Sequence, residues 1–158
     1  MKKTTKFYII MTIILGLGIT IDLITKSLTT NVTMPLISGI VSIAFTWNKG
    51  AGWSLFSEHT LVLTIFTGFL IVGIILLIIF FKPKSLVYAI GISMILAGAI
   101  GNFIDRVVFG AVRDFICLEF MTFPIFNVAD VLLTVGVILL CVWLIFLSGK
   151  KENKNAEN

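Results

Sequence analysis

Four long apolar runs constrain this chain more than any other feature of its sequence. They contain between 17 and 22 residues, with Asp22 as their one charged side chain, and they cover residues 7–23, 60–81, 86–104 and 131–147. A membrane-spanning helix needs about 20 apolar residues, with a range of roughly 17–25, so each run is long enough to span a bilayer. The rest of the chain is too short to bury four such helices in a soluble core. We therefore predict four transmembrane helices.

The composition excludes the soluble classes of protein. Hydrophobic residues make up 58% of the chain and charged residues only 13%, whereas a soluble domain carries about 25% charged residues. The basic residues lie at the ends of apolar runs, so the positive net charge does not indicate a nucleic-acid partner. With two cysteines and one histidine, too few ligands are present for a structural zinc site. We expect no metal and no cofactor.

The distribution of charge predicts the topology. The N-terminus, the connection between the second and third runs, and the C-terminus have a combined net charge of +6. The other two connections, together with Asp22 at the end of the first run, have −2. The positive-inside rule then places both termini in the cytoplasm and residues 24–59 and 105–130 outside. No small-x-small cleavage site follows the first run, so we expect it to be retained. We expect residues 1–150 to form a single membrane domain with up-down helices, followed by a polar cytoplasmic tail at 151–158.

The first outward segment, 24–59, has a strand pattern. Ile43, Phe45 and Trp47 alternate with small or polar residues, which is typical of a strand with one apolar face. We expect a small β-sheet on the outer membrane surface, anchored by Trp47 and Trp53; the alternative is an apolar loop that caps the helices. In the third run, small residues recur every fourth position and predict close helix packing: Ala89, Ser93, Ala97 and Gly101.

Ionisable side chains near the ends of the spans are candidates for function. A charge at membrane depth costs about 2.5–3.5 kcal/mol on the insertion scale, so such residues need a reason to be there. Six of them converge on the predicted outer layer: Asp22, Lys26, Asp105, Arg106, Asp114 and Asp130. Asp22 and Lys26 are four residues apart, which favours a self-neutralising pair on one helix face that could position a site.

The neighbouring polar residues allow several partners. Arg106 could pair with Asp105 or with lipid phosphates. Asn102 lies inside an apolar run, so its amide needs partners, either on the fourth helix or in a substrate backbone.

Asp114 and Asp130 indicate a specific chemistry. Two carboxyl groups close together in a low-dielectric site cannot both ionise, so one keeps its proton. One can then act as a general base on water and the other as a general acid on the leaving amine, which hydrolyses a peptide bond. Alternatively, Asp130 caps the N-terminus of the fourth helix. The residues alone leave both interpretations open.

Other functions have weaker support in the sequence. A Cys117–His59 pair, or a dyad of Ser54 or Ser57 with a lysine, has no local signature. A proton-coupled carrier would place its carboxylates near the bilayer midplane, whereas these acids gather at one interface. A non-catalytic lipid-binding or assembly subunit is the remaining alternative.

The chain resembles the lipoprotein signal peptidase (signal peptidase II) family. The resemblance rests on five short motifs in family order between residues 22 and 130, which end the first span, follow the predicted strand, end the third span and flank the two aspartates: Asp22-Leu-Ile-Thr-Lys26, Asn48-Lys-Gly50-Ala51, Gly101-Asn102-Phe-Ile-Asp105-Arg106, Val112-Arg-Asp114-Phe115 and Phe126-Asn127-Val-Ala129-Asp130. One departure is Gly52-Trp53, where the family usually has Ala-Phe.

The resemblance implies a bacterial membrane aspartic endopeptidase. Such enzymes cut signal peptides from prolipoproteins on the N-terminal side of a diacylglyceryl-modified cysteine, at the outer face of the cytoplasmic membrane. Asp114 and Asp130 match the catalytic pair. Five residues match positions near the substrate or the antibiotic globomycin: Asn48, Gly50, Asn102, Arg106 and Asn127. Asp22, Lys26 and Asp105 match supporting positions. Asn127 and Arg106 are the nearest candidates to stabilise an oxyanion. The implied partners are lipidated precursors, membrane lipid and globomycin-type inhibitors.

Overall fold

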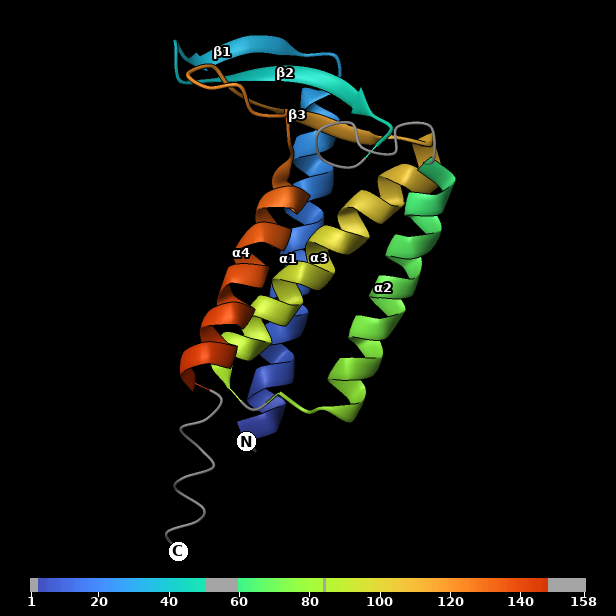
Figure 1. Cartoon of the computed structure of the whole chain (residues 1–158), viewed down its shortest axis with the longest axis vertical. Coiled ribbons are helices and arrows are strands. Elements are labelled where there is room, and N and C mark those ends of the chain that lie inside the picture. Colours follow the sequence, from blue (N-terminus) through green and yellow to red (C-terminus); the bar gives the residue numbers. More distant parts are fainter. Residues whose placement is uncertain (1–2, 51–59, 84, 148–158) are drawn as a thin grey trace, which may run out of the picture.

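Four long helices of the described residues form the body of the molecule (Figure 1). The structure is a computed structural model that describes residues 3–50, 60–83 and 85–147. The helices are α1 (Lys3–Thr29), α2 (Thr60–Phe80), α3 (Leu86–Phe109) and α4 (Val128–Val142), and a π-helical segment, η2 (Trp143–Leu147), continues α4. Each of the four, with η2 counted as part of α4, is long and apolar enough to cross a membrane. The prediction of four spans is confirmed.

Two helices extend further than the apolar runs indicated. We predicted outward segments beginning at residues 24 and 105, but α1 continues to Thr29 and α3 to Phe109. The helices outlast the apolar runs because Lys26 and Asp105, which follow those runs, are fully buried inside the protein. Where the outward segments begin stays a prediction. Gly110, with a φ of 69°, ends α3 in a left-handed C-cap, a conformation that glycine adopts without strain.

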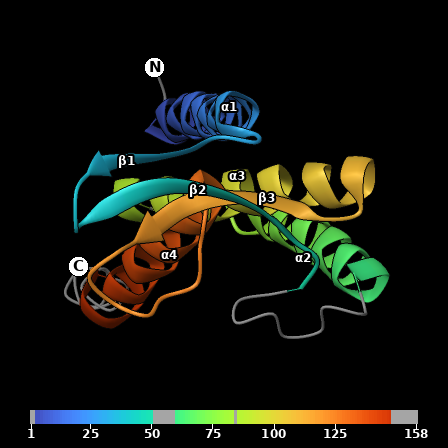
Figure 2. The same ribbon diagram turned by 90° about the horizontal axis from the view of Figure 1, so that it is seen from above.

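Helix α3 packs against the other three helices (Figure 2). The predicted row of small residues along α3 is buried, from Ala89 to Gly101. Gly91 and Gly136 allow α3 and α4 to approach closely, since a Cβ on Gly136 would lie 2.7 Å from the backbone oxygen of Gly91. The packing of small residues, which drives helix association in membranes, therefore fixes how α4 sits on α3.

A three-stranded antiparallel sheet lies across one end of the helices (Figures 1 and 2). Its order is β1 (Thr33–Ile37), β2 (Val41–Asn48) and β3 (Val112–Leu118). The predicted strand between residues 24 and 59 is confirmed as β2, and Trp47 packs on Phe109 of α3 with ring centroids 5.5 Å apart. The third strand, β3, was not predicted. Trp53 lies outside the described residues.

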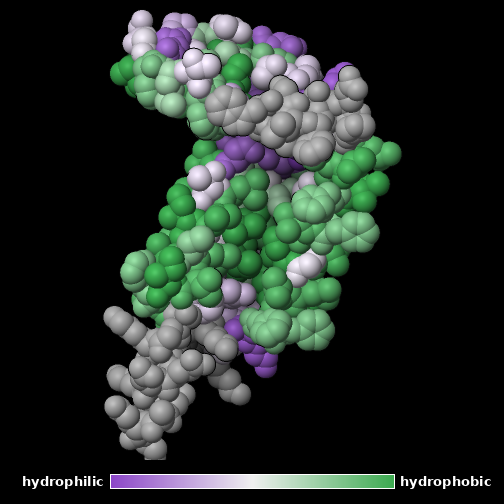
Figure 3. Space-filling view, viewed as in Figure 1, coloured by the Kyte–Doolittle hydropathy of each residue, from purple (hydrophilic) through white to green (hydrophobic). Residues whose placement is uncertain are grey.

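The flank of the helices is hydrophobic (Figure 3). Large apolar side chains point outward from α2, among them Phe66, Phe69 and Phe80, which are 66–74% exposed. Burying such side chains in lipid removes the cost of exposing them to water, so the chain is a multi-pass membrane protein. Hydrophilic residues gather beneath the sheet and at the opposite end of the helices (Figure 3).

Candidate active site

A cavity of about 530 Å³ opens between the sheet and the ends of α3 and α4. Phe123, Pro124 and Phe126 supply part of its apolar lining. The polar residues that line it come from β2, α3, β3 and α4: Asn48, Asn102, Arg106, Asp114, Asp130 and Thr134. Five of these six were candidates in the sequence, and the fold brings them to one place from positions up to 82 residues apart along the chain.

Asp114 reaches the cavity from the middle of β3 and is only 1% exposed. Its Oδ2 accepts a hydrogen bond from Asn48 Nδ2 at 2.8 Å, and its Oδ1 accepts one from Asn127 Nδ2 at 2.6 Å. Burial raises the pKa of Asp114 to about 6, and the neighbouring charge of Asp130 acts in the same direction. The Asp114 carboxyl is thus poised to hold or release a proton near neutral pH.

Asp130 both completes the cap of α4 and faces the cavity. Its Oδ2 accepts the backbone N–H of Asn127 at 3.1 Å, while Asn127 Oδ1 accepts the backbone N–H of Asp130 at 3.0 Å. This reciprocal pair is a capping box. The other carboxyl oxygen of Asp130, Oδ1, accepts a hydrogen bond from Asn102 Nδ2 at 2.8 Å. The N-cap of α4 is thus Asn127 and not Asp130, which completes the capping box from the third helical position. This contact is compatible with a chemical role for Asp130.

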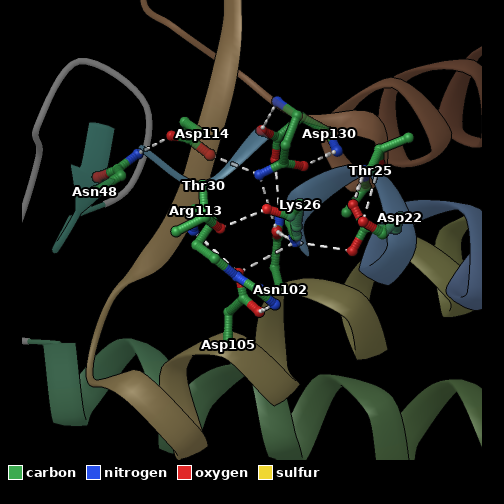
Figure 4. Close-up of polar contacts among 12 residues, drawn as sticks. Asp22, Thr25, Lys26, Thr30, Asn48, Asn102, Asp105, Arg113, Asp114 and Asp130 are labelled. Atoms are coloured by element: carbon green, nitrogen blue, oxygen red, sulfur yellow. Dashed lines mark hydrogen bonds and ion pairs between the residues drawn. The ribbon is translucent and has the colours of Figure 1, made fainter. Parts of the chain in front are cut away.

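A buried ionic cluster lies behind Asn102 (Figure 4). Lys26 Nζ is 2.8 Å from Asp22 Oδ2, 3.6 Å from Asp105 Oδ2 and 2.9 Å from Asn102 Oδ1. Asp22 Oδ1 also accepts the backbone N–H of Ala129 at 2.8 Å. The predicted pair of Asp22 and Lys26 is confirmed, and its second contacts join α1 to α3 and to the start of α4.

Asp105 has a different partner from the one expected. We considered Arg106 as its partner, but Arg113 Nη2 lies 2.7 Å from Asp105 Oδ1, and Arg113 Nε and backbone N–H donate to Asp105 Oδ2. The side chains alternate along β3, so Arg113 points away from its neighbour Asp114 toward α3. Sequence reasoning missed Arg113 as a structural residue because β3, whose alternation directs the side chain toward α3, was not predicted.

Arg106 instead reaches the segment after β2. Its Nη2 donates to the backbone oxygen of Gly50 at 3.2 Å, and the N–H of Gly50 is held by Asn48 Oδ1 at 2.9 Å. Within the described part of the chain, the buried Nε of Arg106 has no hydrogen-bond partner. Arg106 therefore brings a cation to the lining of the cavity, with one buried N–H that is unpaired within these residues.

Some sequence candidates cannot be placed at the site. Residues 51–59, which include Ala51, Gly52, Trp53, Ser54, Ser57 and His59, lie outside the described residues. Cys117 is partly buried on β3 and pairs in register with Ser42.

Comparison with known proteins identifies the family of the chain. A family model described as "Signal peptidase (SPase) II" matches residues 13–146. The chain belongs to the signal peptidase II family. A lipoprotein signal peptidase of Enterococcus faecalis is 46% identical over 80% of this chain and 79% of its own length. One of Clostridium acetobutylicum is 33% identical over 90% of this chain and 97% of its own.

Solved structures support the membership. A bacterial membrane enzyme solved by the in meso method at 2.3 Å resolution superposes with a TM-score of 0.82 at 32% sequence identity, covering 89% of this chain and 90% of its own. The resemblance inferred from the five motifs is confirmed, and this signal peptidase II homologue is a peptidase. The carrier and assembly-subunit alternatives are set aside by the same finding.

Proposed function

We propose that the chain removes the signal peptide from diacylglyceryl-modified prolipoproteins, cutting on the N-terminal side of the lipidated cysteine, with Asp114 and Asp130 as the catalytic pair. The observation that carries the proposal is the arrangement of the two carboxyl groups. Both line one cavity, and both are held by Asn127, which binds Asp114 through its side-chain N–H and Asp130 through its backbone N–H. The relatives named as lipoprotein signal peptidases support the choice of substrate.

The two carboxyl groups divide the proton transfers between them. Asp130 accepts a proton from a water molecule as the water oxygen bonds to the scissile carbonyl carbon. Asp114, whose pKa is raised to about 6 by burial and by the Asp130 charge, donates its proton to the leaving amide nitrogen as the C–N bond breaks. The products are a carboxylic acid and an amine, and transfer of one proton from Asp130 to Asp114 restores the starting state.

Arg106 supplies a donor for the developing oxyanion. Its buried Nε has no partner among the described residues, and its side chain lines the same cavity as the carboxyl groups. A donor aimed at the carbonyl oxygen is worth more in a low-dielectric site than in water. Asn48 supports Asp114 directly, because its side-chain N–H donates to the carboxyl group. Gly50 supports Asp114 indirectly, because its backbone N–H donates to the side-chain oxygen of Asn48.

The apolar part of the cavity suits a lipidated substrate. Val131 and Val135 of α4 continue the lining from Asp130 along the helix, so an acyl chain can enter from the membrane beside the carboxyl groups. A globomycin-type inhibitor would occupy the same space and compete with the substrate. Membrane lipid covers the remaining apolar flank.

The orientation follows from the positive-inside rule. We propose that the chain lies in the bacterial cytoplasmic membrane, with both termini in the cytoplasm and the active site at the outer face. The single membrane domain of residues 1–150 and the polar tail at 151–158 belong to the same proposal.

The test uses the whole enzyme in lipid vesicles with two versions of one precursor. In one version the cysteine that follows the cleavage site carries the diacylglyceryl group, and in the other the same cysteine is unmodified. We expect cleavage of the lipidated version alone, and mass spectrometry should place the new N-terminus at the modified cysteine. Equal cleavage of both versions, or a cut elsewhere, contradicts the proposal.

A further inference from the structure

We propose that Lys26 is a positioning residue that fixes the orientation of the Asn102 amide and, through it, the hydrogen bond that Asp130 receives. The inference rests on the proposed roles of Asp114 and Asp130. It adds a task for a residue that does not line the cavity and that the family resemblance marks only as supporting.

The surroundings of Lys26 explain why a lysine is tolerated there. The side chain is 0% exposed, and a buried ammonium needs carboxylate partners and hydrogen bonds on its three donors. Asp22 Oδ2 lies at 2.8 Å and Asp105 Oδ2 at 3.6 Å. These two acids neutralise the charge, and the third contact, to Asn102 Oδ1 at 2.9 Å, carries the effect of Lys26 toward the cavity.

The Asn102 side chain has two chemically different ends in one plane, and only one orientation satisfies its neighbours. Its Oδ1 accepts from Lys26 and from Asn127 Nδ2 at 3.2 Å, while its Nδ2 donates to Asp130 Oδ1 at 2.8 Å. Rotating the amide by 180° would set its N–H₂ against an ammonium and an amide N–H₂, and its oxygen against a carboxylate. The ammonium makes the charge-assisted contact at the oxygen end of the amide, and it holds this orientation independently of the Asp130 carboxyl at the other end.

Asn127 does not depend on Lys26 in this way. Its side-chain oxygen accepts the backbone N–H of Asp130 in the capping box, so its Nδ2 faces Asp114 and Asn102 whatever lies beyond them. The two aspartates are therefore oriented by separate sets of hydrogen bonds. The helix cap fixes the donor to Asp114, and Lys26 fixes the donor from Asn102 to Asp130.

The test uses double variants that keep the charge of the buried cluster balanced, because Asp22 and Asp105 offset Lys26 and Arg113. Lys26→Met alone would leave Asp22 without its cation, whereas Asp105 keeps Arg113, so the change is made together with Asp22→Asn, whose amide oxygen still accepts the N–H of Ala129. Against the wild-type enzyme, whose buried cluster has the same net charge, we expect the Asp22→Asn/Lys26→Met variant to lower kcat by about 10- to 100-fold, which corresponds to one hydrogen bond to a charged group. KM should change less than threefold, because Lys26 does not reach the cavity.

Two further comparisons separate positioning from general support of the fold. Asp22→Asn/Lys26→Gln keeps an N–H donor toward Asn102 and should recover most of the lost kcat. In an Asn102→Ala background, the Asp22→Asn/Lys26→Met change should have no further effect on kcat, because the residue through which it acts is absent. Thr30→Val, directly after α1, is the matched control: the Thr30 hydroxyl donates to the backbone oxygen of Lys26, and its loss should leave kcat unchanged.

Three results would overturn the inference: an unchanged kcat in the Lys26→Met variant, equal losses in the Met and Gln variants, or the same loss with and without Asn102. The Met variant could fail to accumulate in the membrane while the Gln variant accumulates and has normal kcat. That result would indicate a structural role for Lys26 and would contradict positioning. Failure of the proposed function gives a different pattern, because Asp114→Asn and Asp130→Asn would then remain active.

Discussion

Asn127 donates its side-chain N–H to Oδ1 of Asp114 over 2.6 Å. The same residue begins α4 as its N-cap, so the cap of a membrane helix and the support of a buried carboxyl are one structure. This explains how β3, which lies above the helices, and α4 are held in fixed positions relative to each other at the cavity. It also means that α4 must form correctly for Asp114 to be oriented.

The proton affinity of Asp114 should depend on two neighbours in opposite directions. Asp130→Asn removes a nearby negative charge, which should lower the pKa of Asp114 from about 6. Asn48→Leu removes a hydrogen bond to the charged form, which should raise the pKa of Asp114. Infrared difference spectra with labelled aspartate can follow both. Shifts in the same direction would show that another group controls Asp114.

Activity should fall on the alkaline side. If Asp114 must be protonated in the free enzyme, kcat/KM declines about tenfold per pH unit once the pH passes about 6. In Asn48→Leu the decline should begin at higher pH. A pH profile that is flat between 6 and 8 for the wild-type enzyme contradicts the assignment of the shared proton to Asp114.

The crossing of α3 and α4 should be sensitive to a single methyl group. In Gly136→Ala the added Cβ would meet the backbone oxygen of Gly91 at 2.7 Å and the backbone nitrogen of Ile95 at 2.9 Å, so the helices must move apart. We expect a loss of about 1–3 kcal/mol in stability, measured by thermal unfolding in detergent.

Gly73→Ala is the matched control for this packing. A Cβ on Gly73 meets nothing within 4 Å. The stability of the Gly73→Ala variant should therefore equal or exceed that of the wild type, since alanine favours helix more than glycine does. Equal losses at Gly136 and Gly73 would mean that the effect is not due to helix packing.

The orientation in the membrane can be tested with two introduced cysteines. In a background with Cys117 and Cys141 replaced by alanine, Lys82→Cys should react with an impermeant thiol reagent only from the cytoplasmic side. Met121→Cys, which lies exposed after β3, should react only from outside. The reverse pattern would overturn the proposed topology, and reaction of both from one side would contradict the crossing of α3.

The sequence predicted the parts of this structure that depend on local composition. The apolar runs located all four helices, the alternation of Ile43, Phe45 and Trp47 located β2, and the short motifs named five of the six polar residues in the cavity. These predictions work because hydrophobic length and periodicity are properties of contiguous residues.

The remaining features depend on contacts between distant residues. Lys26 appeared to mark the end of a span, but its partners Asn102 and Asp105 lie on another helix, and their contacts allow α1 to continue. Similarly, β3 exists because it pairs with β2, and its own residues gave too short a pattern to predict it. The dual role of Asp130 needed both Asn102 and Asn127 in place.

The central claim is that Asp114 and Asp130 together carry the chemistry, and single-turnover cleavage of a lipidated precursor tests it most directly. Asp114→Asn and Asp130→Asn should each lower the cleavage rate by at least about 10²–10⁴-fold while the protein stays in the membrane. Glu119→Gln, an acid-to-amide change at an exposed residue that holds the N–H of Gly39, should leave the rate unchanged. If either aspartate variant keeps more than about a tenth of the wild-type rate, the two-carboxyl account is wrong.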